Sequence, residues 1–265
     1  MIEKEDAGEI KTCCATFYQS DIVRLLLGDV FHPGGLELTG YLGTVTGLGS
    51  EDKVLDIACG RGASDVYLAK RFGCHVTGLD YGQDNILSAQ NHASLEKVSR
   101  LTTFRKGDAE GLSFEKESFD VVISECSFCT FPDKEKAAQE MMRVLRKHGR
   151  LGMTDMTTSA PLPEDFQSLL GWIACVTGAG SSKLYVSILE KAGFSDFIVE
   201  DKQDSLLEMV NNVRHKLLGI ELVAGIRKLE LGDIDLSKAK SLTQRTLELI
   251  QNGTISYTLF KASKR

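Results

Sequence analysis

The sequence of 265 residues lacks a long apolar run and an excess of basic side chains. No stretch approaches the roughly 20 apolar residues that a membrane-spanning helix needs. The first ten residues, MIEKEDAGEI, are too acidic for a secretory signal or a transit peptide. With 31 Lys plus Arg against 37 Asp plus Glu, the net charge of -6 offers no broad positive field for a phosphate backbone. We therefore expect a cytoplasmic protein that has neither a membrane nor a nucleic acid as its partner.

Proline and cysteine are also scarce, and we find no internal repeat or low-complexity tract. There are four prolines, and the seven cysteines are an odd number and a small share of a chain of this length. A disulfide framework is therefore not expected, and the thiols should be free. The chain has 42% hydrophobic residues and is long enough to bury the core of one large domain. We expect a single compact domain with attached helices.

Strand and helix patterns alternate between residues 53 and 155, because short buried β-type runs are separated by segments with helical periodicity. The expected strands cover residues 53–58, 74–80, 102–108, 119–125 and 149–155, and the expected helices cover residues 61–73, 83–98 and 133–147. Strands that alternate with helices form a parallel sheet covered on both faces. The sequence thus predicts a doubly wound α/β core over residues 51–158.

Helical segments precede and follow this core. Residues 1–50 are expected to form an N-terminal cap with helices over residues 15–30 and 36–48. Residues 159–265 are expected to form the substrate side, with helices over 164–177 and 181–193, a helical insert over 204–252, and strands over 196–201 and 254–264. The β-branched and aromatic content of the last segment favours an antiparallel strand beside the parallel ones. Seven strands result.

A small-residue turn follows the first expected strand, in the segment VLDIACGRGAS. Gly60 and Gly62 lack the Cβ that would keep a ligand from the backbone, and the helix that begins there offers unpaired N–H groups to a carboxylate or another anion. Asp80 ends the next strand, where a carboxylate can accept both hydroxyls of a ribose. If the Gly-x-Gly pattern is taken alone, an ordinary strand-to-helix turn is the alternative to a cofactor-binding turn.

Acidic side chains follow two further strands at the same sheet edge. Asp108 and Ala109 come after the third strand, where an acid can hold the exocyclic amine of adenine, and Ser124 and Glu125 end the fourth. A dinucleotide site would need a third glycine where Asp65 stands, so NAD and FAD are disfavoured. The pattern favours a nucleoside cofactor.

The chain resembles the class I S-adenosylmethionine (SAM)-dependent methyltransferases over residues 53–155. The matching segments, in order, are VLDIACGRG, GLDYG, GDAEGLSFEKESFDVVIS and RVLRKHGRLGMTD. The resemblance implies a Rossmann-like methyltransferase fold that binds SAM. The resemblance implies that Asp56, Gly60 and Gly62 line the methionine end, Asp80 the ribose, and Asp108 with Ala109 the adenine. Further candidates for cofactor binding are Tyr81, next to Asp80, and Ser124 and Glu125 at the fourth strand end. Ala58 stands where the family usually has its first glycine, and we expect a slight adjustment there. Tyr18 either closes over the methionine end or packs in the core.

The cysteines bear on the methyl acceptor, because methyl transfer is an in-line displacement from a sulfonium by an atom with a free electron pair. Cys126 and Cys129 follow the fourth strand in ECSFC, next to the expected methyl position, and neither a zinc site nor a redox pair is favoured for them. Cys59 and Cys74 are expected to be small buried thiols. Packing and function are equal alternatives for Cys13, Cys14 and Cys175.

Two segments are similar to the arsenite methyltransferases within this superfamily, namely ISECSFCTFPDK and the stretch from TDMTTSAPLP to CVTGAGSSKLY. The resemblance implies that Cys175 and an N-terminal cysteine are thiolate ligands of As(III), a soft metalloid whose lone pair can attack a methyl group. The third cysteine that those enzymes usually carry is missing after Cys175. A three-thiolate site would then use Cys13, Cys14, Cys126 or Cys129, or an external thiol.

Three functions stay open at this point. The first is methylation of a thiolate-bound metalloid, with an external thiol as reductant. The second is C- or O-methylation of a small apolar metabolite. The third is a module that binds SAM without catalysis. His32 is either a base near the site entrance or a structural turn residue beside Pro33.

Overall fold

The computed structural model describes residues 30–163, 178–227 and 236–265, together with residues 8, 11, 12, 28, 166 and 176. Most residues of the two helices expected over residues 15–30 and 164–177 lie outside these described residues. So do four of the candidate site residues, Cys13, Cys14, Tyr18 and Cys175.

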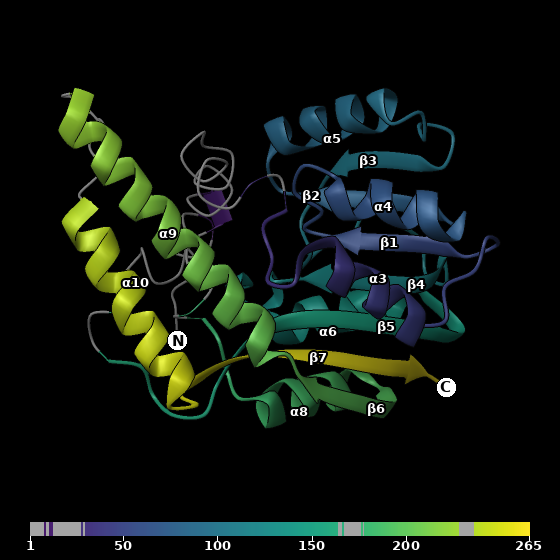
Figure 1. The fold of residues 1–265 in the computed structure, drawn as a ribbon. Coiled ribbons are helices and arrows are strands. Elements are labelled where there is room, and N and C mark those ends of the chain that lie inside the picture. The colour runs from purple at the N-terminus through teal and green to yellow at the C-terminus, as the bar shows by residue number, and fades with distance from the viewer. Residues whose placement is uncertain are drawn as a thin grey trace.

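Seven strands form one sheet in the order β3-β2-β1-β4-β5-β7-β6 (Figure 1). They are β1 (Lys53–Ile57), β2 (His75–Asp80), β3 (Thr102–Lys106), β4 (Phe119–Glu125), β5 (Leu145–Thr158), β6 (Phe194–Asp201) and β7 (Ile255–Lys264). The strands from β1 to β5 pair in parallel, and β7 runs antiparallel to both β5 and β6. The predicted doubly wound sheet with an antiparallel last strand is confirmed.

Helices cover both faces of the sheet, which explains why the central strands are apolar on both sides. The helices α3 (Gly35–Val45), α4 (Ala63–Phe72) and α5 (Gln83–Leu95) share one core with Val54 of β1, and α6 (Lys134–Val144) and α8 (Ser182–Ala192) share the other with Leu55 and Ile57. Successive side chains of a strand point to opposite faces. Asp56 therefore faces the side of the sheet that α3 and α4 cover.

A pair of long helices follows β6. The helices α9 (Gln203–Arg227) and α10 (Leu236–Gln251) pack against one another and against β7. They extend beyond the sheet on the side where β1 ends (Figure 1). The two helices occupy the region expected as a helical insert over residues 204–252.

The boundary between α6 and β5 differs from the sequence-based expectation. The helix expected over residues 133–147 ends at Val144, and β5 begins at Leu145 rather than at residue 149. Asp133 caps the start of α6, because its side chain accepts a hydrogen bond from the backbone N–H of Lys136. At the other end Leu145 already pairs with Phe119 of β4, so pairing across the sheet ends the helix before its periodic pattern stops.

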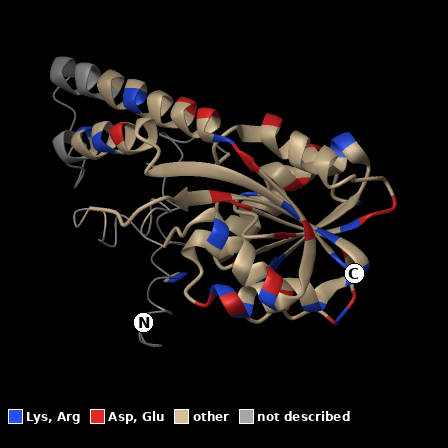
Figure 2. Cartoon of the chain, turned by 90° about the horizontal axis from the view of Figure 1, so that it is seen from below, with Lys and Arg blue, Asp and Glu red and all other residues tan. Residues whose placement is uncertain are grey.

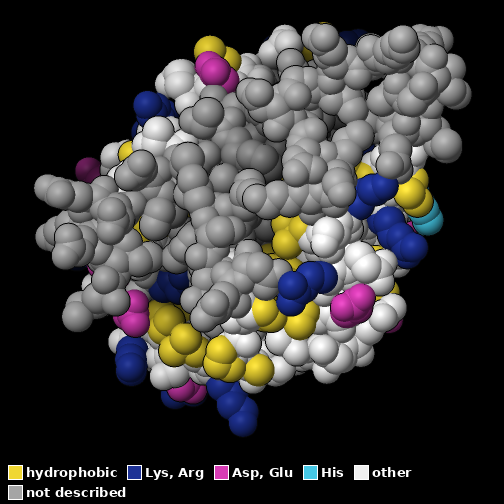
Figure 3. All heavy atoms as spheres, turned by 90° about the vertical axis from the view of Figure 1, so that its left-hand side faces the viewer, with side chains coloured by type: hydrophobic (Ala, Val, Ile, Leu, Met, Phe, Trp, Pro, Cys, Tyr) yellow, Lys and Arg dark blue, Asp and Glu magenta, His cyan; other side chains and the backbone are white. Residues whose placement is uncertain are grey.

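Basic and acidic residues are both distributed over the described helices and loops around the sheet (Figure 2). The face drawn in Figure 3 shows apolar, basic and acidic side chains next to one another around the part that is not described. No helix in the described part of the chain is long and apolar enough to cross a membrane. The expected cytoplasmic location stays a prediction.

The contact between α3 and β5 depends on a glycine. A Cβ on Gly152 would lie 2.7 Å from Cγ2 of Thr46 and 3.0 Å from Cδ1 of Leu42. Replacing Gly152 by Ala should therefore push α3 away from the sheet and lower the free energy of unfolding by about 1–3 kcal/mol. Urea unfolding followed by circular dichroism measures the change. Gly111→Ala is the control, because a Cβ there meets no atom within 4 Å, and equal stability of the two variants would contradict the prediction.

Candidate functional site

A cavity opens at the carboxyl ends of β1, β2 and β4, where the strand order reverses between β1 and β4. Such a reversal leaves a crevice beside the strand ends in open α/β sheets. Ten of the residues expected at the site line this cavity, namely His32, Asp56, Ala58, Gly60, Asp80, Tyr81, Asp108, Ala109, Glu125 and Cys126. Gly62 and Ser124 shape the site from outside its lining. The sequence thus placed most of the described candidates around one space.

The turn after β1 adopts a backbone conformation that suits glycine. Gly60 and Gly62 have φ values of 54° and 76°, and a Cβ on Gly62 would lie 2.8 Å from the Cβ of Ala89 on α5. Ala58 has a φ of 63°, which is strained for a residue with a Cβ. At the position where a slight adjustment was expected, Ala58 thus has a left-handed backbone conformation.

Asp80 holds this turn at the end of β2. One carboxylate oxygen accepts a hydrogen bond from the backbone N–H of Gly60 at 2.9 Å. The other accepts from the backbone N–H of Gly82 at 2.7 Å and from the side-chain amide of Asn85 at 3.0 Å. Burial raises the pKa of Asp80, and these three donors act in the opposite direction. No motif in the sequence indicated Asn85.

Lys11 reaches the far end of the cavity from a segment 97 residues away. Its ammonium group lies 2.8 Å from a carboxylate oxygen of Asp108 and 2.5 Å from one of Glu110. Burial lowers the pKa of Lys11, but the two carboxylates outweigh this effect and raise the pKa overall. The acid that the sequence indicated for adenine is thus already paired with a cation, a contact that no local pattern predicts.

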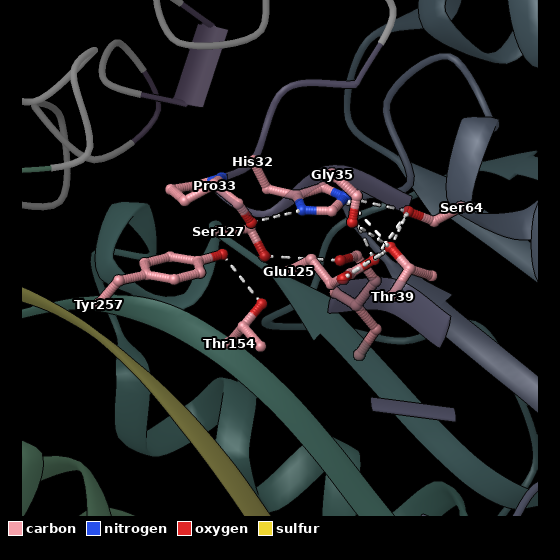
Figure 4. Close-up of polar contacts among 10 residues, drawn as sticks. His32, Pro33, Gly35, Thr39, Ser64, Glu125, Ser127, Thr154 and Tyr257 are labelled. Carbon is pink, nitrogen blue, oxygen red and sulfur yellow. Dashed lines mark hydrogen bonds and ion pairs between the residues drawn. The ribbon is translucent and has the colours of Figure 1, made fainter. Parts of the chain in front are cut away.

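A buried polar cluster surrounds Glu125 at the end of β4 (Figure 4). Ser64 donates its hydroxyl hydrogen bond to the carboxylate at 2.7 Å, and Thr39 donates to both oxygens at 3.0 and 3.1 Å. The Nε2 atom of His32 lies 3.5 Å from the same carboxylate, whose side chain is 4% exposed. The cluster joins α3, the start of α4 and the loop before α3 to the sheet.

Both ring nitrogens of His32 face protein atoms. Nδ1 lies 3.2 Å from the carbonyl oxygen of Pro33, which can only accept, and Nε2 lies 3.3 Å from the hydroxyl of Ser64. The loop that His32 anchors places the ring of Phe31 over Gly60, since a Cβ on Gly60 would lie 3.4 Å from that ring. These contacts hold the loop before α3 against the site, and a role of His32 as a base stays a prediction.

Cys126 lines the cavity just after β4. Its φ of 53° is uncommon for a residue with a side chain, and its backbone N–H donates to the carbonyl of Thr154 at 2.7 Å. Cys129 is fully buried in a short 3₁₀ helix (Phe128–Thr130) and does not line the cavity. No group of three or more possible metal ligands occurs among the described residues.

Two buried side chains support the strand ends near Cys126. Asp155 accepts hydrogen bonds from the backbone N–H groups of Ser127 at 3.0 Å and Cys129 at 3.2 Å. Tyr257 of β7 donates its hydroxyl to that of Thr154 at 2.9 Å (Figure 4), and burial raises the pKa of Tyr257 well above its usual value. The sequence did not single out either residue, because each acts across the sheet.

Replacing Thr39 by Val should remove the hydroxyl that binds both oxygens of Glu125. The buried carboxylate would lose a donor, so the free energy of unfolding should fall by about 1–3 kcal/mol. Urea unfolding measures it. Thr44→Val is the matched control on the same helix, because the Thr44 hydroxyl only donates to the carbonyl of Gly40. A loss of stability that is equal in the two variants would refute the importance of the contact.

Comparison with known proteins gives the family of this chain. Residues 48–193, more than half of the chain, match the family described as "Methyltransferase domain". An arsenite methyltransferase of Halobacterium salinarum is 32% identical over 160 residues, which cover 58% of this chain and 40% of that protein. A sarcosine/dimethylglycine N-methyltransferase of Halorhodospira halochloris is 30% identical over 171 residues, or 64% of this chain and 61% of that protein. The first relatives are matched over half of their length or less.

The fold also has close solved counterparts. A phosphoethanolamine N-methyltransferase 2 of Haemonchus contortus in complex with SAM superposes with a TM-score of 0.80 at 21% identity, over all of this chain and 60% of that chain. The same enzyme in complex with phosphomonomethylethanolamine and S-adenosylhomocysteine gives a TM-score of 0.81 over 96% of this chain and 60% of that chain. This chain belongs to the methyltransferase domain family, and the prediction of a class I SAM-dependent methyltransferase domain is confirmed.

Proposed function

We propose that this chain binds SAM in the described cavity and transfers its methyl group to a small acceptor. The observation that carries the proposal is the convergence of the glycine turn, Asp80 and Asp108 on one cavity at the carboxyl edge of the sheet. When bound, SAM supplies an electrophilic methyl group on a sulfonium. The chain supplies binding and orientation, and it keeps water from the reacting atoms.

The charges around the cavity fit this cofactor. Asp56, Asp80 and Glu125 line it, and Asp56, Asp80 and the side chain of Glu125 are largely buried. A site rich in carboxylates favours a ligand that carries a sulfonium and an ammonium group over a phosphate-bearing dinucleotide. The backbone of Gly60 is open to close approach because a side chain is absent there.

Each part of the cavity is suited to one part of the cofactor. We assign the methionine end to the turn that holds Asp56, Ala58 and Gly60, with Gly62 shaping its backbone. The ribose is assigned to Asp80, with Tyr81 beside it. We assign the adenine to Asp108 and Ala109, where Lys11 pairs with the acid, and the methyl group to the space beside Ser124, Glu125 and Cys126.

Replacing Asp80 by Asn should weaken SAM binding by about tenfold or more, because two ribose hydroxyls would lose a charged acceptor. Isothermal titration calorimetry measures the dissociation constant, and a melting curve shows whether the turn survives. Asp84→Asn is the control, because Asp84 is exposed in the first turn of the next helix. If both variants bind SAM as the unaltered protein does, the ribose is not at Asp80.

For the acceptor, the leading candidate is As(III) bound by thiolates, or a similar soft metalloid. The ring nitrogens of His32 and the carboxylate of Glu125 are engaged with protein groups. An acceptor that has its own free electron pair therefore fits the described cavity better than an alcohol, which would need a base to remove its proton. Cys126 is the described cysteine of the ECSFC segment that lines the cavity. The arsenic lone pair would form the new bond to carbon as the bond from carbon to sulfur breaks, and the electron pair of that bond stays on sulfur.

Further thiols would complete the ligand set. Cys13, Cys14 and Cys175 are the candidates from the sequence, and they lie outside the described residues. An external small thiol is the alternative third ligand and a reductant for the product.

Cys126→Ser should lower the methylation of As(III) by at least about tenfold, because a hydroxyl is a poor ligand for a soft metalloid. The assay combines labelled SAM, As(III) and a small thiol. Cys74→Ser is the matched control, since Cys74 is buried outside the cavity and burial raises its pKa to about 11. Unchanged turnover in Cys126→Ser would remove Cys126 from the ligand set, and no turnover in the unaltered protein would remove the metalloid.

The second candidate is C- or O-methylation of a small apolar metabolite. Apolar side chains from several elements also line the cavity, among them Val30, Phe31, Leu79 and Phe131. Such an acceptor would be methylated equally well by the Cys126→Ser variant. SAM binding without methylation of any acceptor in a broad screen would leave a binding module, which is the third function that the sequence allows.

A further inference from the structure

Asp65 is a buried acid that does not line the cavity described above and has no role in the proposed function. It lies in the first turn of α4 with none of its surface exposed. Neither side-chain oxygen has a hydrogen-bond donor of good geometry among the described residues. A Cβ on Gly78 of β2 would lie 2.6 Å from Oδ1 of Asp65, so the sheet leaves space for this carboxyl group.

The polar neighbour of Asp65 is the carboxyl group of Asp56, which is 3% exposed and lines the cavity. Asp56 pairs with Gly78 across β1 and β2 and faces the side of the sheet that α4 covers, so its carboxyl group lies close to that of Asp65 above Gly78. A proton held by one of two adjacent buried carboxyl groups removes the repulsion between two negative charges. Burial raises the pKa of Asp56 well above its usual value and that of Asp65 to about 7, and the charges of Asp80 and Glu125 act in the same direction. At neutral pH the pair therefore retains a proton.

We propose that Asp65 and Asp56 share a proton in the ligand-free protein and release it to solvent when the cationic cofactor binds. Asp65 is then a positioning residue that does not touch the cofactor. It acts through Asp56. Because of Asp65, the charge of Asp56 depends on whether a cation is present.

The reason is electrostatic. SAM carries an ammonium and a sulfonium group, and a positive charge beside Asp56 favours the ionised pair over the protonated one. S-adenosylhomocysteine keeps the ammonium group but has a neutral thioether, so it should displace less of the proton. The pair would thus help the site to distinguish cofactor from product. This inference depends on the proposed placement of the methionine end at Asp56.

Other titratable groups surround the pair and affect its charge. Asp80 on β2 and Glu125 on β4 face both carboxyl groups, His32 faces Glu125, and the buried thiol of Cys59 lies on the same side of β2 as Asp65. Because the free protein binds more protons than the complex, the affinity for SAM should rise with pH. The dissociation constant of SAM should fall by at most about tenfold per pH unit for each proton released.

Calorimetry in two buffers of different ionisation enthalpy counts the protons released per ligand bound. For the unaltered protein near pH 7, SAM should release a measurable fraction of a proton, up to about one, and S-adenosylhomocysteine should release less. Equal release by the two ligands, or none by SAM, would overturn the inference. If SAM does not bind at all, the cofactor assignment itself fails, which separates the two results.

Asp65→Asn tests the role of the pair directly. An amide at this position can donate to Asp56 and keep it ionised, so proton release should fall and SAM affinity should change little between about pH 6 and pH 8. Asp84→Asn, an exposed acid in the first turn of α5, is the matched control and should keep the pH dependence. An unchanged pH dependence in Asp65→Asn would overturn the inference. If that variant does not fold, the comparison of SAM with S-adenosylhomocysteine on the unaltered protein decides.

Discussion

The burial of carboxyl groups at the carboxyl edge of the sheet is the constraint on which the rest of the site depends. Asp56, Asp65 and Asp80 are almost fully inaccessible, and so is the side chain of Glu125. A buried carboxylate costs several kcal/mol unless donors or a proton compensate for it. Asp80 is compensated by backbone and amide N–H groups, and Glu125 by hydroxyl groups. Among the described residues the side-chain oxygens of Asp65 have no hydrogen-bond donor, so Asp65 and the neighbouring Asp56 are the part of the site most sensitive to an added positive charge.

The hydrogen-bond donors that compensate the buried carboxylates also hold the walls of the cavity together. Because Glu125 takes hydrogen bonds from α3 and from the start of α4, the helix before the first strand is fixed to the end of the fourth. The loop before α3 then carries Phe31 over Gly60. Lys11 closes the opposite end through Asp108 and Glu110. The same contacts therefore stabilise the fold and define where a ligand can lie.

The part of the cavity proposed for the acceptor differs in character from the part proposed for the cofactor. Cys126 stands in a left-handed conformation that its backbone bond to Thr154 maintains, with Asp155 and Tyr257 fixing the neighbouring strand ends. Relatives with this domain include proteins named for arsenite, phosphoethanolamine and sarcosine or dimethylglycine. Proteins that share this domain are thus named for acceptors of different chemistry.

The sequence by itself determined the order of strands and helices between residues 53 and 155, since periodicity is a local property of the chain. It also determined the turn after β1, because Gly60 and Gly62 meet a backbone requirement within a few residues. Only the tertiary structure decided the partners of the acids. Thr39 reaches Glu125 across 86 residues, Lys11 reaches Asp108 across 97, and Tyr257 reaches Thr154 across 103. Such contacts depend on which helices cover which face of the sheet and on the return of β7 between β5 and β6, and no local pattern encodes either.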